Sequence, residues 1–562
     1  MGQRCGIVVR LLLGLLMFDK RALPAELPAA SEANATGYVG DTVCARCHDL
    51  ISESYSRTNM AHASGLALEN FIQADFTHKK SGVHYRIYEE GGSVWLSFER
   101  PGDPSVQGKR KLLYYIGSGH RGLTYLFSMD GFFFESPVNW YGKSHIWDMT
   151  PAYQDAKEMP LNLPVFTSCL RCHVSAMQPP ISATENRYAM PLLRYSGITC
   201  EQCHGPGAAH ANGGPIVNPA KLPPERRDQV CMQCHLEGKI AIERAGRHAY
   251  DYRPGDNLSN FIRYYVLEGS SRLGAVSQVE AMAQSACRRK SGDKMSCTSC
   301  HDPHYLPSAS ERDVYYRGKC LACHGAAFGA QHHADQPDCT ACHMSALQST
   351  DVAHTQVTDH RIPRRPELSG SLLPDLKQGS TPTLVPFPRT AEPERDVRDL
   401  ALAWQSLAER GIDAAGPKAE SLLRSALKTS PDDPALLSAL GYVEQRRGRT
   451  ERAQELYRRA LTFDPDSVDV LNNLGVIEAK AGHSSEAVKV WAEAFQHAPG
   501  RSSLGMNIAE AFCEAGQFDA ARTTVLRVLE FNPDDGTGRE LLKNMNHEPA
   551  SCGSFQAEHY RK

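Results

Sequence analysis

The sequence predicts a mainly α-helical protein with one small β-rich insert, and three observations lead to this fold class. Within 562 residues, the string Cys-x-x-Cys-His occurs seven times. A period of 34 residues runs through the C-terminal part, with Pro, Gly and Ala returning in register, which is typical of paired helices in an α-solenoid. Between these two patterns lies a segment dense in proline.

Each Cys-x-x-Cys-His string is the signature for covalent attachment of a c-type haem. The two thiols form thioethers to the porphyrin, and the histidine becomes the proximal iron ligand. A zinc knuckle gives no reason for His to follow the second Cys every time, and a thioredoxin motif occurs once per domain. We therefore predict seven haem c groups. The residues predicted to hold them are Cys44, Cys47 and His48; Cys169, Cys172 and His173; Cys200, Cys203 and His204; Cys231, Cys234 and His235; Cys297, Cys300 and His301; Cys320, Cys323 and His324; and Cys339, Cys342 and His343.

The N-terminus is typical of an export signal. Arg4 precedes an apolar stretch from Ile7 to Phe18, interrupted by Arg10, and small residues follow from Ala22 to Ala30. This order predicts a secretory signal peptide, with an uncleaved anchor as the alternative. In bacteria, haem is attached to c-type cytochromes outside the cytoplasmic membrane, so the haem motifs lead to the same expectation of export. The protein is therefore expected in the periplasm or outside the cell, where peripheral association with a membrane is allowed.

A β-rich insert is expected between the first two motifs. Residues 83–88 and 93–98 flank the turn 89–92 and are predicted to form the two arms of a β-hairpin. Residues 111–116 and 123–127 could add two more strands.

The six remaining motifs follow one another closely along the chain, between Cys169 and His343. This stretch is too short to give each porphyrin a separate pocket, so the haems themselves are expected to form much of the apolar core. Closely packed haems would provide a continuous path for electrons.

The C-terminal part begins with seven prolines between Pro363 and Pro393 and no Cys or His, which predicts a semi-extended linker. The 34-residue period then predicts three tetratricopeptide units at 434–467, 468–501 and 502–535, preceded by a degenerate one from about Asp399. The predicted domains are a signal peptide or anchor at 1–30, a heptahaem domain at 31–362 with the β-rich insert at about 75–165, the linker at 363–395, the repeat domain at 396–545 and a tail at 546–562.

The haem motifs and their surroundings resemble the cytochrome c554 and octahaem (hydroxylamine oxidoreductase-like) group, including its members with tetratricopeptide repeats. The similar segments are 197–207 with His210, 297–304, and 338–344 with His354 and His360. The resemblance covers about residues 38–362. It implies a multihaem core but not one activity, because the group contains both carriers and enzymes.

An electron-transfer haem needs a second axial ligand, and histidine is the commonest choice. The resemblance implies His210, His304, His354 and His360 as distal ligands. His62 is a further prediction from its position after the first motif, with Met60 as the alternative. His120 and the pair His332-His333 remain open candidates. Since twelve histidines outside the motifs lie in the haem region, their number does not show whether one iron stays open.

We predict an exported electron carrier whose repeats dock a protein or peptide, with redox proteins as donor and acceptor. The alternative is a multihaem reductase or oxidoreductase acting on nitrite, hydroxylamine or a tetrathionate-like oxyanion at one open haem, and no catalytic residue is assigned. A weaker third idea is a scaffold for extracellular electron transfer. Nearly balanced charge, 61 Lys and Arg against 64 Asp and Glu, gives no sign of a nucleic-acid partner.

Four cysteines lie outside the motifs: Cys5, Cys287, Cys513 and Cys552. Cys5 falls in the predicted signal segment. The other three show no pairing pattern, so we expect buried thiols and no disulfide framework.

Overall fold

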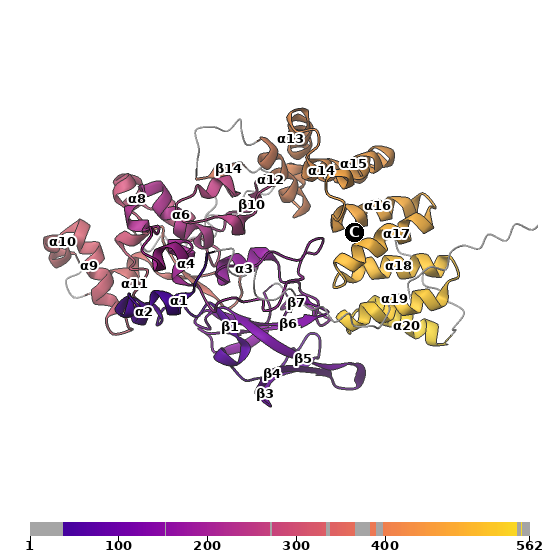
Figure 1. Cartoon of the computed structure of the whole chain (residues 1–562), viewed down its shortest axis with the longest axis horizontal. Helices are drawn as coiled ribbons and strands as arrows, with labels where there is room; N and C mark the ends of the chain where they lie inside the picture. Colours follow the sequence, from indigo (N-terminus) through magenta and orange to yellow (C-terminus); the bar gives the residue numbers. More distant parts are fainter. Residues whose placement is uncertain are drawn as a thin grey trace, which may run out of the picture.

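The computed structural model describes residues 37–151, 153–269, 273–332, 336, 338–365, 383–388, 397–547 and 552. The predicted signal peptide or anchor lies outside the described residues, as does most of the predicted tail. A mixed region of helices, strands and loops is followed by a helical solenoid (Figure 1). Within the described part of the chain, no helix is both long and apolar enough to cross a bilayer.

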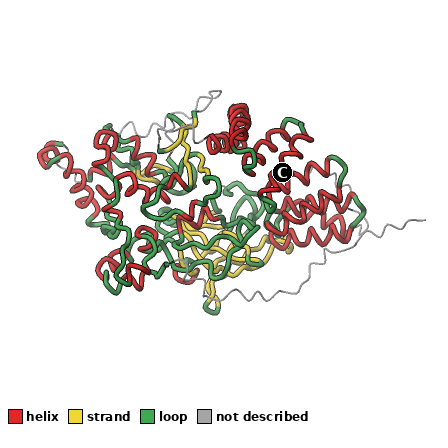
Figure 2. Tube along the Cα trace, turned by 45° about the horizontal axis from the view of Figure 1, so that its top comes forward, coloured by secondary structure: helices red, strands yellow, loops and turns green. Residues whose placement is uncertain are grey.

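A nine-stranded antiparallel sheet forms the N-terminal part of the mixed region. Its order is β2-β3-β4-β5-β6-β8-β9, with β1 paired to β5 and β7 paired to β6. The mainly α expectation therefore fits the solenoid but not this region, where strands gather between two groups of helices (Figure 2). The strands are β1 (Ser64–Leu66), β2 (Ala74–Thr77), β3 (His84–Glu90), β4 (Ser93–Arg100), β5 (Asp103–Ile116), β6 (Gly122–Met129), β7 (Phe132–Glu135), β8 (Val138–Tyr141) and β9 (Ile146–Met149).

The hairpin β3–β4 shows why this segment folds as a sheet. Its tight turn is Gly91-Gly92, and both residues have positive φ (60° and 70°), as the two-residue hairpin turn requires. Along β4, alternate side chains from Val94 to Phe98 are buried in the core of the sheet. The predicted hairpin is therefore present, and its second strand turns one face to the core.

Short helices carry the haem motifs. Five of them end at the histidine of a motif: α3 (Thr167–His173), α4 (Cys200–His204), α6 (Pro224–His235), α9 (Arg312–His324) and α11 (Cys339–His343). The first motif begins in α1 (Asp41–Cys44) and precedes α2 (Asp49–Tyr55), and the fifth begins in the 3-10 helix η7 (Cys297–Ser299). The connecting helices are α5 (Ala208–Ala211), α7 (Gln278–Gln284), α8 (Ala286–Ser291) and α10 (Ala326–Gln331).

Two small sheets support these helices. One is the pair β12 (Ala346–Gln348) and β13 (Gln356–Thr358), and the other has the order β10 (Ile240–Glu243), β11 (Ile262–Leu267), β14 (Leu384–Phe387). Strand β14 lies inside the predicted linker, of which only 363–365 and 383–388 are described. An edge strand tolerates its proline, and Leu384 is buried against the first solenoid helices. This part of the linker is thus a structural element of the haem region.

The solenoid consists of nine described helices, eight of them in four antiparallel pairs and α20 last, and the starts of equivalent helices follow the period of the sequence repeat. Small residues let the paired helices approach: Gly441 faces Tyr457, and Gly475 faces Trp491. The helices are α12 (Val397–Glu409), α13 (Gly416–Thr429), α14 (Pro434–Arg446), α15 (Thr450–Phe463), α16 (Val468–Lys480), α17 (Ser484–His497), α18 (Ser502–Glu514), α19 (Phe518–Phe531) and α20 (Gly536–His547).

One expectation about the cysteines is wrong. Cys513, at the end of α18, forms a disulfide with Cys552, and their Cα atoms are 5.9 Å apart. Cys552 is buried in the core of the solenoid. No sequence pattern indicates this pair, because 39 residues separate the two cysteines and the spacing repeats nowhere else. Cys287 is a free thiol, as expected.

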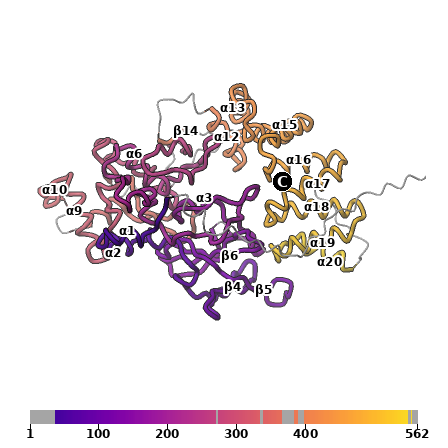
Figure 3. Tube along the Cα trace, viewed as in Figure 1, coloured from indigo at the N-terminus to yellow at the C-terminus, as the bar shows by residue number. Residues whose placement is uncertain are grey.

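The solenoid is held against the mixed region at both ends (Figure 3). At the first helix, Arg244 Nη1 lies 2.5 Å from Oδ2 of Asp399, which is only 2% exposed. At the last repeat, Arg100 Nη1 donates to Asp534 Oδ1 at 2.8 Å. Phe531 packs edge-on against Phe134 of β7, with ring centres 5.8 Å apart. The repeats therefore do not hang from a free tether but pack on the sheet and on β10.

Candidate haem-binding sites

The helical turn explains why the motifs can hold a planar ligand. Residues three apart lie on the same face of a helix, so the two cysteines of a motif present their thiols in one direction. The histidine comes directly after the second cysteine, at or next to the helix end, where its ring can turn toward the same ligand. The fold thus places two thiols and one imidazole together at each of the motif helices α3, α4, α6, α9 and α11.

Four motif histidines face a second imidazole. In each pair the ring centres lie between 6.0 and 6.3 Å apart, and the angle between the ring planes is 34° or less. The pairs are His48 with His210 (6.3 Å), His204 with His304 (6.0 Å), His301 with His360 (6.2 Å) and His343 with His332 (6.0 Å).

This separation is the one that two ligands of a single metal ion would have. Metal–imidazole bonds of about 2.0 Å, plus about 1.1 Å from each nitrogen to its ring centre, place two opposed rings about 6.2 Å apart. Direct stacking of aromatic rings would permit shorter separations as well. Four pairs with nearly equal separations therefore fit an iron between the rings better than ordinary packing.

Backbone carbonyls fix the orientation of several of these rings. Nδ1 of His204 donates to Val217 O at 2.8 Å, and Nδ1 of His343 donates to Pro363 O at 2.9 Å. His210 and His360 make the same kind of contact through Nδ1, at 3.0 and 2.9 Å. A hydrogen bond at Nδ1 leaves Nε2 free to bind a metal, which is the usual arrangement of histidine ligands.

Burial keeps several of these imidazoles neutral. It lowers the pKa of His301 to about 4, and it is the largest cause of the lowered pKa of His173, His235 and His360. Neutral imidazole is the form that binds iron. These rings are therefore in the ligand form at neutral pH without losing a proton first.

Three motif histidines lack such a partner. Among the described residues, no imidazole faces His173, His235 or His324 at a comparable distance, and the ring of His324 contacts Phe328 instead. Counting only the described residues, four motifs therefore have a second imidazole opposite their histidine and three do not.

The structure places the remaining predicted distal ligands elsewhere. Nε2 of His62 lies 2.8 Å from Ser56 O. Nε2 of His354 lies 2.7 Å from Asp148 Oδ2, and its ring packs edge-on against Tyr141. Neither ring faces a motif imidazole among the described residues. His332, which the sequence left open together with His333, is the residue that faces His343.

Neighbouring motifs are close to one another. The hydrogen bond from Cys234 lowers the pKa of the Cys172 thiol to about 7, and the contact with Cys231 raises the pKa of Cys297. The thiols that come this close across motifs are Cys44 and Cys200, Cys172 and Cys234, Cys231 and Cys297, and Cys320 and Cys339. As thioethers these sulfurs would not titrate, but their closeness shows which haem sites adjoin.

The space between the motifs fits several large groups. A connected cavity of about 3530 Å³ is lined by residues from six of the seven motifs and by His332 and His360. An ordinary small-molecule pocket measures about 300–1,000 Å³. Together with the paired thiols and opposed imidazoles, this cavity has the donor set and the size that covalently bound haems require.

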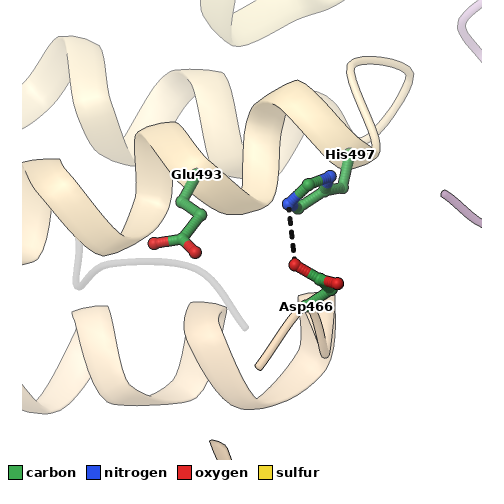
Figure 4. Close-up of side chains that lie close together, drawn as sticks. All are labelled: Asp466, Glu493 and His497. Atoms are coloured by element: carbon green, nitrogen blue, oxygen red, sulfur yellow. Dashed lines mark ion pairs between the residues drawn. The ribbon is translucent and has the colours of Figure 1, made fainter. Parts of the chain in front are cut away.

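A separate cluster lies in the solenoid, where Asp466, Glu493 and His497 bring their polar atoms together (Figure 4). Nε2 of His497 is 3.6 Å from Oδ1 of Asp466, and Glu493 lies one turn earlier on α17. This ion pair accounts for the arrangement, and we assign no metal to it.

Comparisons with known families agree with these two regions. Residues 138–205, which contain the second and third motifs, match the family model described as cytochrome c554 and c-prime. Residues 434–477 and 478–544 match two tetratricopeptide repeat models. The chain therefore carries a cytochrome c554-type region and tetratricopeptide repeats.

One curated relative is the multiheme cytochrome MtrA of Shewanella baltica (strain OS185). It is 24% identical over 182 residues, which cover 28% of this chain and 52% of the relative, so the match spans about half of the relative's length. Among solved structures, MamA of AMB-1 is 22% identical, and the match covers 27% of this chain and 84% of the MamA chain, with a TM-score of 0.25. The protein pilF of Pseudomonas aeruginosa is 25% identical, and the match covers 28% of this chain and 72% of the pilF chain, also with a TM-score of 0.25.

Proposed function

We propose that this chain is an exported c-type cytochrome that binds seven haems and passes electrons through them, with its repeats docking a partner protein. The observation that carries the proposal is the set of four imidazole pairs at 6.0–6.3 Å, each with one ring from a motif. An iron held by two imidazoles has no open position for a substrate, so its chemistry is the gain and loss of one electron. The haem supplies that redox chemistry when bound.

The ligand pairs also connect the haem sites in space. His210 faces His48 and lies only six residues after His204, so the sites of the first and third motifs adjoin. In the same way, His304 faces His204 and lies three residues after His301, which joins the third site to the fifth. Each distal ligand thus belongs to the segment that carries another motif. This arrangement supports a continuous path for electrons.

An oxidising location outside the cytoplasm agrees with the cysteine chemistry. Disulfides persist in the periplasm and outside the cell and are rare in the cytosol, and the solenoid contains the disulfide Cys513–Cys552. The similarity to the multiheme cytochrome MtrA supports the same location. We therefore propose that the mature protein is periplasmic or extracellular.

The repeats are proposed to dock a protein partner, because solenoids of this kind present extended binding surfaces. Their contacts at Asp399 and Asp534 hold the solenoid on the mixed region. A partner bound to the repeats would therefore be kept at a constant distance from the haems. Electron donor and acceptor are proposed to be redox proteins.

A second candidate function follows from the motifs with one imidazole. If the iron at His173 or His235 keeps an open position, a small oxyanion such as nitrite, or hydroxylamine, could bind there and be reduced. Both histidines line the large cavity, as do Arg263 and Tyr264 of β11. This alternative differs from the carrier in one property, an iron that binds added ligands.

The intact mass of the purified holoprotein tests the haem count, and peptide mapping assigns each haem to its motif. The proposal expects seven haem additions, one on each Cys-x-x-Cys-His peptide. A motif found with two free thiols or bound zinc would overturn the count. Addition of cyanide or nitrite, followed by optical spectroscopy, then separates the carrier from the reductase.

A further inference from the structure

Glu135 is a half-buried residue whose carboxyl pairs with no described side chain. It ends β7, where it lies opposite Leu126 of β6, and its backbone N–H donates to Leu163 O at 2.9 Å. The side chain lines the large cavity. Among the described residues, no hydrogen bond or ion pair reaches its carboxylate. Burial alone raises the pKa of Glu135 to about 7.

Among the described residues, no positively charged side chain lowers the pKa of Glu135. The titratable groups that face it are the hydroxyl of Tyr153, from the loop after β9, and the thiol of Cys169, on α3. Burial is the main cause of the raised pKa of both groups, and the charge of Glu135 raises both further. The segment at Leu163 contributes backbone, and β6 contributes Leu126 and, further along the strand, the hydroxyl of Thr124. Glu135 is therefore an isolated acid beside the second haem motif.

A second polar group opens into the same cavity. Thr124 lies two residues before Leu126 on β6, and hence on the same face of the strand as the partner of Glu135. Its hydroxyl is buried without a hydrogen-bond partner, and the residue lines the cavity. An orphaned hydroxyl on this face is where a water could bridge toward the acid. Such a water would give the carboxyl a hydrogen-bond partner inside the cavity.

We propose that Glu135 binds a proton when the haem attached through Cys169 and Cys172 is reduced and releases it when that haem is oxidised. The inference rests on the proposed haem at this motif. One electron from the donor protein or a neighbouring haem lowers the charge of the iron by one. The carboxylate takes one proton from solvent and becomes a neutral acid, so the charge inside the pocket stays constant.

Reduction of the haem and protonation of Glu135 would be coupled because the cavity has a lower dielectric constant than water. A unit charge added in the cavity that Glu135 lines interacts with a half-buried carboxylate more strongly than it would in water. Reduction therefore favours the protonated acid. Because coupling between two binding events is reciprocal, protonation of Glu135 must favour reduction of the haem by the same factor. The chain would thereby move a proton together with an electron at this site.

Spectroelectrochemical titration of the holoprotein at several pH values tests this coupling. In the wild-type protein, the equilibrium constant for reduction of one haem should fall up to tenfold for each pH unit near neutral pH. For a one-electron couple, this corresponds to a fall of about 59 mV in the reduction potential. Glu135→Gln should abolish this dependence, and Glu135→Asp should keep it. Glu158→Gln is the matched control, because Glu158 also has a pKa raised mainly by burial but lies against Gly536, outside the cavity lining.

Infrared difference spectra of the reduced and oxidised wild-type protein give a direct readout. A carboxylic C=O band should appear on reduction, shift in heavy water and be absent from Glu135→Gln. No such band in the wild type, or an unchanged pH dependence in a Glu135→Gln protein with full haem content, overturns the proposal. Peptide mapping of the Cys169–Cys172 segment distinguishes failure of this proposal from failure of the proposed function. If no haem is attached to this segment, the proposal of seven haems is refuted.

Discussion

At the scale of single residues, the proximal ligands follow from local sequence, and the distal ligands do not. The motif fixes two cysteines and a histidine within one short string. The second imidazole comes from a distant part of the chain, as with His48 and His210. His210, His304 and His360 were expected as distal ligands, and the structure brings each of them opposite a motif ring.

His62 and His354 show the limit of that reasoning. Both lie at plausible positions along the chain, yet one contacts a backbone carbonyl and the other an aspartate. Nothing local in the sequence encodes the distance between two rings. The unpartnered side chain of Glu135 was missed for the same reason, because its isolation depends on the packing of β6, β7 and α3.

Removal of a distal ligand should change the spin state of one haem. His304→Ala takes away the ring opposite His204, so one low-spin iron should become high-spin and bind cyanide. Optical and EPR spectra of the purified variant measure this change.

His354→Ala is the matched comparison for that variant. Its imidazole contacts Asp148 and faces no motif ring among the described residues, so the spin states should stay as in the wild type. A high-spin iron in His354→Ala, with none in His304→Ala, would contradict the ligand pairs.

At the scale of elements, repetition made the solenoid predictable. The repeat period predicted units that begin at 434, 468 and 502, and α14, α16 and α18 begin at these residues. In the sheet, three of the four expected strands lie within the longer strands β4, β5 and β6, and the strand expected at 83–88 is β3, which begins one residue later. The short strands β1, β2, β7, β8 and β9 were missed, since so few residues carry too little alternation to be recognised.

The disulfide should stabilise the solenoid. Cys552→Ser removes the disulfide between Cys513 and Cys552, which are 39 positions apart. The loss should lower the free energy of unfolding by about 2–4 kcal/mol. Urea unfolding of the full chain, followed by far-ultraviolet circular dichroism, measures the effect. Cys287→Ser changes a free cysteine outside the motifs and is the control. Equal stability of the two variants would mean that the cross-link does not form.

At the scale of the whole molecule, buried ion pairs join the solenoid to the mixed region. Asp534 is 1% exposed and accepts hydrogen bonds from Arg100, Arg539 and the backbone N–H of Met159. The sequence predicted a semi-extended, Pro-rich linker and no contact between the repeats and the haem region. The docked arrangement could not be foreseen, because its contacts link residues far apart in the sequence, such as Arg100 and Asp534, which are 434 positions apart.

Loss of this buried carboxylate should release one end of the solenoid. Asp534→Ala removes the buried carboxylate from Arg100 and Arg539, which then keep Asp103 as their ion-pair partner, and should destabilise the docked state by about 1–3 kcal/mol. Hydrogen exchange should then rise in α20 and in β4. Asp432→Ala removes an exposed partner of Arg459 and should change exchange very little. Unchanged protection in Asp534→Ala would show that the two regions are held together by other contacts.

The central claim is that four of the seven haem irons are held between two imidazoles. Low-temperature EPR of the fully oxidised holoprotein, quantified against total haem, tests it most directly. The account predicts that at least four of seven irons are low-spin, and that any high-spin signal accounts for no more than three and responds to added cyanide or nitrite. Fewer than four low-spin irons would contradict the ligand pairs on which the proposed electron path depends.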